Sequence, residues 1–364
     1  MKDKIKLIKP YISFNEVSSE LEEIFDSGQL TKGKHVARFV KSLTDYTGSL
    51  YAVPMTSATT ALTMCLKALG IKKGDKVAIS DFSFPATANV VEDVEATPIF
   101  IDVDKDTYNM SVDDLRSKLD DKVKAVIFVD ALGSPSGIDK IKAVCEEFNI
   151  PLIEDAACAI GSSVNGIKVG NIADLTCFSF HPRKLLTTGE GGAILTNNPE
   201  YATWLDMKAN HGASGLRGKV FDFIDFGYNY RMSEIQALMG WKQIAKLDGI
   251  TERRNLIADQ YAVALEPLGM KRQKIAEGIY HNIQSLIFTV PETVKRDDLI
   301  DYLAEHNIES TLGTYCLSGT TFYANKYNAV QPTAHWLENH TITLPCYDGV
   351  DVQTVTDVIS GFFA

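Results

Sequence analysis

Residues 177–192 read Cys177-Phe178-Ser179-Phe180-His181-Pro182-Arg183-Lys184-Leu185-Leu186-Thr187-Thr188-Gly189-Glu190-Gly191-Gly192. The apolar run 175–180 predicts a strand that delivers Lys184 into a polar turn, and a second strand follows the glycine cluster. A lysine fixed at a strand end can be desolvated, and the resulting fall in pKa makes its amine a nucleophile toward an aldehyde. The plainer interpretation is a surface lysine beside a glycine turn.

A second strand end carries two carboxylates, in Ile153-Glu154-Asp155. Their side chains point to opposite faces of the strand, so only one of them can meet a given ligand. Asp155 could pair with a pyridine nitrogen and keep it protonated, although an acidic helix cap is the alternative. Together, Lys184 and Asp155 suggest pyridoxal phosphate chemistry.

Two further segments follow strands and offer contacts to such a cofactor. Ser57-Ala58-Thr59-Thr60 opens a helix, whose free N–H groups and hydroxyls form a seat for a phosphate. An ordinary Ser/Thr N-cap is the other interpretation. Phe84, after the next strand, could stack on a flat ring, or it could be a core phenylalanine.

Bulk properties narrow the class of protein. The chain has 364 residues, is 45% hydrophobic and 23% charged, and has a net charge of −11. No apolar run is long enough to span a membrane, and the charge argues against nonspecific nucleic-acid binding. The six cysteines include no C-x-x-C pair, so we expect neither a zinc site nor a disulfide framework. These features predict a cytoplasmic enzyme.

Short apolar runs alternate with helical patterns over the first half of the chain. The expected strands are 51–55, 76–80, 97–103, 124–130, 151–154, 175–180 and 193–196. Their continuous hydrophobicity predicts a sheet buried on both faces, and the alternation predicts a three-layer α/β domain. The glycine-rich signatures of dinucleotide-binding domains and of P-loops are missing from the sequence.

The pattern changes after residue 197. Helical periodicity dominates residues 199–268, most clearly at 232–247. A strand at 285–290 and helices at 296–306 and 352–362 then indicate a small α+β domain. We therefore expect a large domain over residues 1–249 and a smaller C-terminal domain over residues 250–364.

Taken in order, these motifs resemble the DegT/StrS sugar aminotransferases, which have fold type I of the pyridoxal phosphate enzymes. The resemblance covers nearly the whole chain. The matching segments are residues 57–62, 82–89, 96–98, 102–104, 154–159, 179–192, 227–233 and 344–347. The fold implied is a three-layer α/β fold with a largely parallel central sheet.

The resemblance also implies roles for individual residues. Lys184 matches the lysine that bonds to pyridoxal phosphate, and Asp155 matches the partner of the pyridine nitrogen. The implied phosphate ligands are Thr59, Thr60 and Ser179, and the implied ring-stacking residue is Phe84. Asn229 matches a residue that reaches the phosphate in the neighbouring subunit, which implies a homodimer with shared active sites.

Three features bear on how closely the chain follows the family. Cys158 occupies a place near the cofactor's ring hydroxyl where relatives often have Gln or His, and a thiol is a poor hydrogen-bonding group. Residues 313–318 match only loosely, so sugar contacts from that segment are not implied. Relatives with histidine in place of the lysine are dehydratases; here Lys184 is present, and His181 lies three residues earlier.

The activity implied is transfer of an amino group from an amino acid, expected to be L-glutamate, to C3 or C4 of a nucleotide-linked keto-deoxysugar. Pyridoxamine phosphate would be the intermediate cofactor form. A UDP-linked 4-keto-6-deoxy-N-acetylhexosamine and synthesis of surface glycan such as lipopolysaccharide are the specific expectations. A pyridoxal phosphate-dependent dehydratase or lyase, and a noncatalytic cofactor-binding regulator, are the alternatives.

Overall fold

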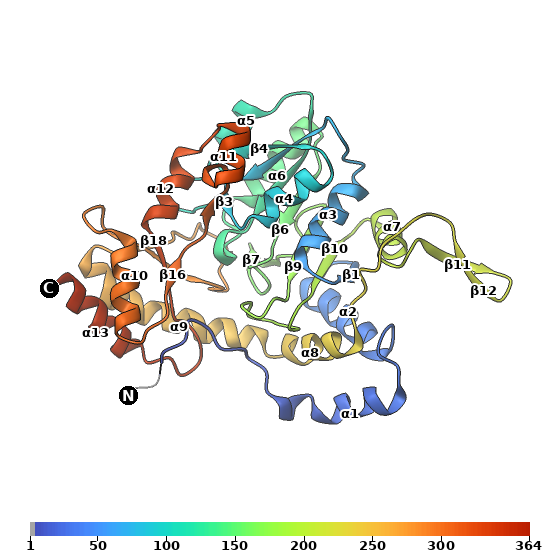
Figure 1. Ribbon diagram of the computed structural model, residues 1–364, viewed down its shortest axis with the longest axis horizontal. Helices are drawn as coiled ribbons and strands as arrows, with labels where there is room; N and C mark the ends of the chain where they lie inside the picture. Colours follow the sequence, from blue (N-terminus) through green and yellow to red (C-terminus); the bar gives the residue numbers. More distant parts are fainter. Residues whose placement is uncertain (1–3) are drawn as a thin grey trace.

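A seven-stranded sheet forms the centre of the molecule in the computed structural model, which describes residues 4–364 (Figure 1). In sheet order the strands are β1 Tyr51–Met55, β10 Gly192–Thr196, β9 Leu175–Ser179, β6 Leu152–Asp155, β5 Val123–Val129, β2 Lys76–Ser80 and β4 Thr97–Ile101. Six of these strands run in the same direction, and β10 alone runs in the opposite direction. The seven expected strands and the largely parallel sheet are therefore confirmed.

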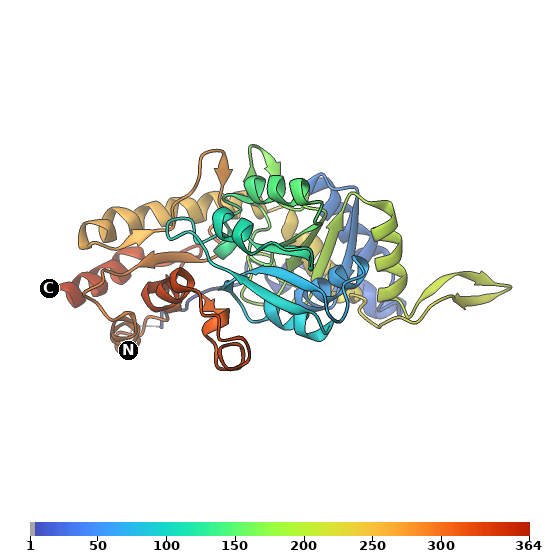
Figure 2. The same ribbon diagram turned by 90° about the horizontal axis from the view of Figure 1, so that it is seen from above.

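Helices cover both faces of this sheet (Figure 2). One face packs against α3 Ala58–Ala68, α4 Ala86–Asp93 and α7 Pro199–Ala209. The other packs against α2 Lys34–Thr47, α5 Val112–Lys118, α6 Ile138–Phe148 and α8 Glu234–Ile244. Alternate residues of one strand serve the two cores: Ile194 lies in the first, and Ala193 and Leu195 lie in the second. The expected three-layer architecture is present.

The long helix α9 Leu247–Leu265 leads to a second, antiparallel sheet. Its strands, in order, are β13 Lys271–Arg272, β15 Leu286–Thr289, β18 Thr341–Leu344 and β16 Thr311–Leu312. The accompanying helices are α10 Arg296–Glu305, α11 Thr321–Tyr327, α12 Pro332–His340 and α13 Val352–Phe363. Residue 250 falls inside α9, and the division of the chain into domains at that point stays a prediction.

The segment between α7 and α9 differs from its expected helical pattern. Strands β11 Ala213–Arg217 and β12 Val220–Phe223 form a hairpin that projects from the body (Figures 1 and 2). The predicted helix over 232–247 is divided, because α8 ends at Ile244 and α9 begins at Leu247. An apolar pattern alone does not distinguish burial in a helix from exposure on a hairpin.

The remaining α-helix and strands lie outside the two main sheets. They are α1 Ser18–Ser27, which packs on α8, the pair β3 Phe82–Ser83 with β17 Tyr315–Cys316, and the sheet β14 Ile279–Tyr280, β7 Ser163–Val164 and β8 Ile167–Lys168. Within residues 4–364, none of the helices has the length and apolar character needed to cross a bilayer.

Candidate active site

The carboxylate of Asp155 and the amine of Lys184 lie within electrostatic reach of each other. Asp155 ends β6, and Lys184 lies in the loop after β9, the neighbouring parallel strand. The Asp155 carboxylate accepts hydrogen bonds from Thr87 Oγ1 (2.7 Å) and from the Ala157 N–H (3.3 Å). Burial raises the pKa of Asp155, while these hydrogen bonds and the Lys184 ammonium oppose that rise.

Cys158 lies directly against the lysine. Lys184 Nζ donates to Cys158 Sγ at 3.0 Å, and both side chains are partly buried. Asn282 Nδ2 fixes the cysteine backbone by donating to its carbonyl at 2.9 Å. Cys158 departs from the family pattern, and its thiol sulfur is in direct contact with the amine of Lys184.

The register of three strands brings the proposed phosphate contacts together. Gly192 lies opposite Met55 on one side and Ser179 on the other, so the start of α3 lies beside the end of β9. A Cβ at Gly192 would lie 2.5 Å from the Ser57 carbonyl carbon, so glycine permits this close approach. Ser179 is buried at this junction.

The N-cap interpretation of the Ser57 segment is correct, and phosphate binding there stays a prediction. Ser57 Oγ accepts from the Thr60 N–H at 3.1 Å, and Thr60 Oγ1 accepts from the Ser57 N–H at 3.1 Å, which forms a capping box. Thr59 is exposed beside it. A phosphate seated here would have Thr59 and the helix N-terminus available, whereas the Thr60 groups already have partners.

Phe84 is not a core residue, because 64% of its surface is exposed. Its ring meets the edge of Tyr315, with 6.3 Å between centroids. An aromatic this exposed, following the β3–β17 pair, is available to stack on a planar ligand.

Asn229 lies on a segment that is exposed but rigidly held. The N–H groups of Tyr228 and Tyr230 donate to the carbonyls of Lys208 (2.7 Å) and Ala209 (3.0 Å). A Cβ at Gly227 would lie 2.2 Å from the Gly212 nitrogen, so this segment is clamped against the end of α7. The backbone therefore presents Asn229 to the outside in a fixed orientation.

Two glutamines that the sequence analysis did not identify hold the lysine loop. Gln284 Oε1 accepts from the Leu185 N–H (2.9 Å), and its Nε2 donates to the Arg183 carbonyl (2.8 Å). Gln243 holds both backbone groups of Thr187 in the same way, at 3.1 and 2.6 Å. These amides fix the backbone on both sides of Lys184. No spacing in the sequence could have revealed partners so distant along the chain.

A buried carboxyl pair, Asp130 and Glu154, lies beside Asp155. Burial, and then repulsion by Glu154 and Asp155, raise the pKa of Asp130 well above its usual range. Burial raises the pKa of Glu154 to about 7, although Thr176 donates to its carboxylate at 2.7 Å. Burial therefore favours the neutral form of Asp130, and it brings the pKa of Glu154 close to neutrality. Asp155 is the carboxyl whose pKa the Lys184 ammonium lowers.

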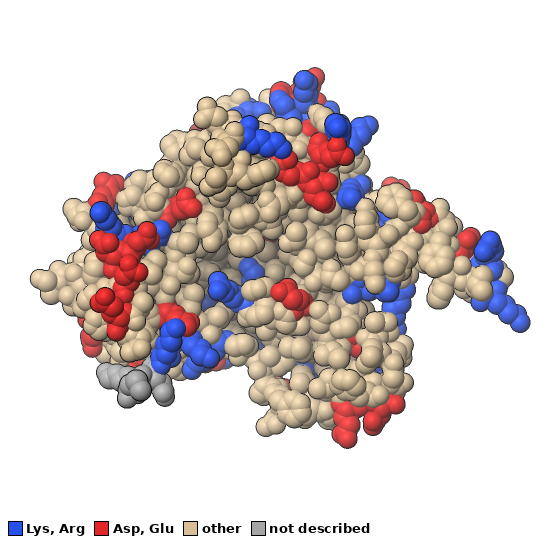
Figure 3. Space-filling model, in the orientation of Figure 1, with Lys and Arg blue, Asp and Glu red and all other residues tan. Residues whose placement is uncertain are grey.

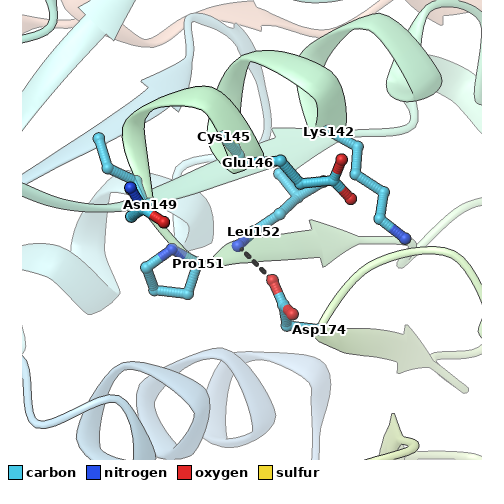
Figure 4. Close-up of a pocket in the computed structure, with 8 residues that line it drawn as sticks. Lys142, Cys145, Glu146, Asn149, Pro151, Leu152 and Asp174 are labelled. Atoms are coloured by element: carbon cyan, nitrogen blue, oxygen red, sulfur yellow. Dashed lines mark hydrogen bonds between the residues drawn. The ribbon is translucent and has the colours of Figure 1, made fainter.

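A cavity of about 530 Å³ opens elsewhere, at the amino ends of β6 and β9 (Figure 4). Its lining includes Leu152 and Asp174, and the Leu152 N–H donates to the Asp174 carboxylate at 2.8 Å. Asp155 and Ser179 lie at the carboxyl ends of the same strands. This cavity is therefore separate from the Lys184 site. Figure 3 shows a different hollow, near the centre of the face in view, where basic side chains lie.

The residues of the site fit pyridoxal phosphate. The buried Asp155 carboxylate has neutral hydrogen-bond donors, and a protonated ring nitrogen would add a cationic partner. Lys184 lies within electrostatic reach of Asp155, the N-terminus of α3 approaches Gly192 beside Ser179, and Phe84 is exposed. The four features match the amine, phosphate and ring requirements of the cofactor.

Comparison with known proteins gives relatives that match nearly the whole chain. GDP-perosamine synthase from Vibrio cholerae is 30% identical and covers 99% of each chain. A DegT DnrJ EryC1 StrS aminotransferase from Brucella abortus superimposes with a TM-score of 0.89 at 30% identity over 96% of each chain. The PLP-form of the putative sugar aminotransferase Spr1654 from Streptococcus pneumoniae gives 0.90 at 28% identity over 99% of this chain and 97% of its own. The model of the DegT/DnrJ/EryC1/StrS aminotransferase family matches residues 13–363, and the chain belongs to that family.

Proposed function

We infer that the protein is a pyridoxal phosphate-dependent aminotransferase that acts on a nucleotide-linked keto-sugar. The observation that carries this proposal is that Lys184, in the loop after β9, lies within electrostatic reach of buried Asp155 at the end of the adjacent parallel strand β6. Pyridoxal phosphate, when bound, supplies an electrophilic carbon for the amine and a ring that accepts electrons from a broken Cα–H bond.

The side chains of the site divide this work. Lys184 would anchor the cofactor, and its amine, once freed by the donor, would carry a proton from the donor's Cα to the cofactor's former aldehyde carbon. Asp155 holds the proton on the ring nitrogen. We propose that Phe84 stacks on the ring, that Thr59 and Ser179 hold the phosphate, and that Cys158 adjoins the ring hydroxyl. Thr60 acts in the cap of α3, because its N–H and hydroxyl are already bonded to Ser57.

The substrates follow from the same proposal. We take L-glutamate as the donor and C3 or C4 of a deoxysugar as the position aminated, with synthesis of surface glycan in the cytoplasm as the setting. The name of the Vibrio relative specifies a GDP-linked sugar, whereas our expectation from the sequence was a UDP-linked 4-keto-6-deoxy-N-acetylhexosamine. Both nucleotides therefore belong in the test.

The test measures 2-oxoglutarate formation from glutamate with GDP- and UDP-linked 4-keto-6-deoxysugars, and identifies the product by mass spectrometry. An aminated sugar nucleotide is expected. Lys184→Ala is the negative control. A deoxygenated product without an amino group would support a dehydratase instead, and cofactor binding without turnover of any keto-sugar would support a regulator.

We also propose that the active unit is a homodimer in which each subunit supplies Asn229 to its partner's site. The exposed, clamped Asn229 segment supports this proposal, as do the exposed side chains of the adjoining hairpin. The large apolar residues of that region are Leu216, Val220, Phe221, Phe223, Ile224 and Phe226, each more than half exposed. So much apolar surface on a projecting hairpin is typical of an interface.

Subunit mixing tests the shared site. Lys184→Ala subunits and Asn229→Ala subunits are each expected to be inactive, and a mixed dimer would hold one site with both residues intact. Refolding the two together should restore part of the activity. Demonstrated subunit exchange without recovery would show that Asn229 does not act across the interface.

A further inference from the structure

Three potential metal ligands from distant parts of the sequence meet between β17 and α12. Cys316 Sγ, an imidazole nitrogen of His335 and a carboxylate oxygen of Glu338 all lie within 4.8 Å of one another. Cys316 ends β17, whereas His335 and Glu338 lie one helical turn apart on α12, which packs beside β3 and β17 (Figure 1). The lack of a C-x-x-C pair, from which we expected no zinc site, concerns only ligands close in sequence, whereas these ligands are brought together by the fold.

The geometry leaves room for an ion between the thiol and the imidazole. His335 Nδ1 lies 3.9 Å from the Glu338 carboxylate. A Cβ on Gly319 would lie 3.2 Å from Cys316 Sγ and 3.7 Å from His335 Nδ1, so the absence of a side chain at residue 319 keeps the space between them open. The Asn339 amide lies 3.4 Å from His335 Nε2, which leaves Nδ1 facing the cluster.

The burial of the three ligands suits capture of an ion from solvent. Cys316 is fully buried, Glu338 is 24% exposed and His335 is 58% exposed at the side chain. A thiolate, an imidazole and a carboxylate are the ligands that Zn²⁺ prefers, and three protein ligands leave a fourth position for water.

The thiol must lose its proton to bind an ion. Cys316 Sγ donates to the Asp81 carboxylate at 3.2 Å, and burial, together with Asp81, raises the pKa of this thiol to about 12. The divalent ion forms a bond to the thiolate sulfur while the thiol proton leaves to solvent. Asp81 keeps two other donors, the Ser318 N–H (2.7 Å) and Oγ (2.6 Å), so it remains hydrogen-bonded after the exchange.

We propose that Cys316, His335 and Glu338 form a binding site for a thiophilic divalent cation of the zinc class, completed by water. The ion would join α12 to β17, whose Tyr315 contacts Phe84. The site is independent of the proposed sugar substrate.

The experiment measures Zn²⁺ binding to untagged, cofactor-loaded protein by calorimetry and by zinc X-ray absorption. We expect one ion per chain, with one sulfur neighbour at about 2.3 Å and nitrogen or oxygen neighbours at about 2.0–2.1 Å. His335→Ala should weaken binding by at least about tenfold. Gly319→Ala, which removes no ligand but fills the space, should also weaken it.

His340→Ala is the matched control, since His340 lies on the same helix but outside the cluster. It should leave Zn²⁺ affinity unchanged. Because His335 is exposed, its replacement should leave the fold intact. The Zn²⁺ affinity of His335→Ala is therefore sufficient to test the site. Equal affinity in wild type and His335→Ala, or a spectrum without a sulfur neighbour, overturns the proposal.

Discussion

The amide of Gln284 holds the lysine loop, so its removal should damage cofactor binding as well as stability. The Gln284→Met variant keeps the length of the side chain but deletes both hydrogen bonds to the backbone that flanks Lys184. The side chain is only 6% exposed, and the Leu185 N–H is left buried without its partner.

The magnitude follows from those two bonds. An unsatisfied buried N–H costs about 1–3 kcal/mol, and loss of the bond to the Arg183 carbonyl, which lies nearer solvent, costs about 1 kcal/mol. The free energy of unfolding should therefore fall by about 2–4 kcal/mol. If misplacement of Lys184 weakens the binding free energy of pyridoxal phosphate by about 1.4 kcal/mol, its affinity falls about tenfold.

Urea unfolding of the cofactor-free protein and absorbance titration with pyridoxal phosphate measure the two effects. Gln273→Met is the matched control, because Gln273 is also buried and donates to the Thr107 (2.7 Å) and Ala131 (3.2 Å) carbonyls instead of to the lysine loop. It should lower stability without changing cofactor affinity. Wild-type cofactor affinity and binding rate in Gln284→Met would refute a positioning role for Gln284.

Three further predictions concern the carboxylates and the lysine. Lys184→Ala should retain the cofactor noncovalently, lose the visible absorbance of its lysine-linked form and lose activity about a thousandfold or more, as absorbance and 2-oxoglutarate assays would detect. Asp155→Asn should lower kcat about a hundredfold while cofactor affinity changes less, and unchanged single-turnover spectra with glutamate would contradict this. Burial raises the Glu154 pKa from 4.5 to about 7, so the native state favours its protonated form, and the stability it provides is lost as pH rises through that range. In Glu154→Gln the free energy of unfolding should therefore fall less between pH 4.5 and about 7 than it does in the wild type. Urea unfolding at several pH values across this range measures the difference.

Much of the fold and part of the site could be predicted from local pattern. Continuous apolar runs identified all seven central strands, because burial on both faces leaves a signal in each short segment. The same runs placed Asp155 and Lys184 at strand ends. The hairpin 213–223 was missed because its apolar side chains are exposed, and periodicity carries no information about what will cover them.

The sequence by itself thus determined the strand order along the chain, the loop that carries Lys184 and the residue types available for its chemistry. Only the tertiary structure decided which distant groups meet: Gln284 with the lysine loop, Cys158 with Lys184, and Cys316 with His335 and Glu338. The physical reason is that periodicity records whether a side chain is buried. Its hydrogen-bond partner depends on how separate elements pack, over separations that reach 99 residues for Leu185 and Gln284.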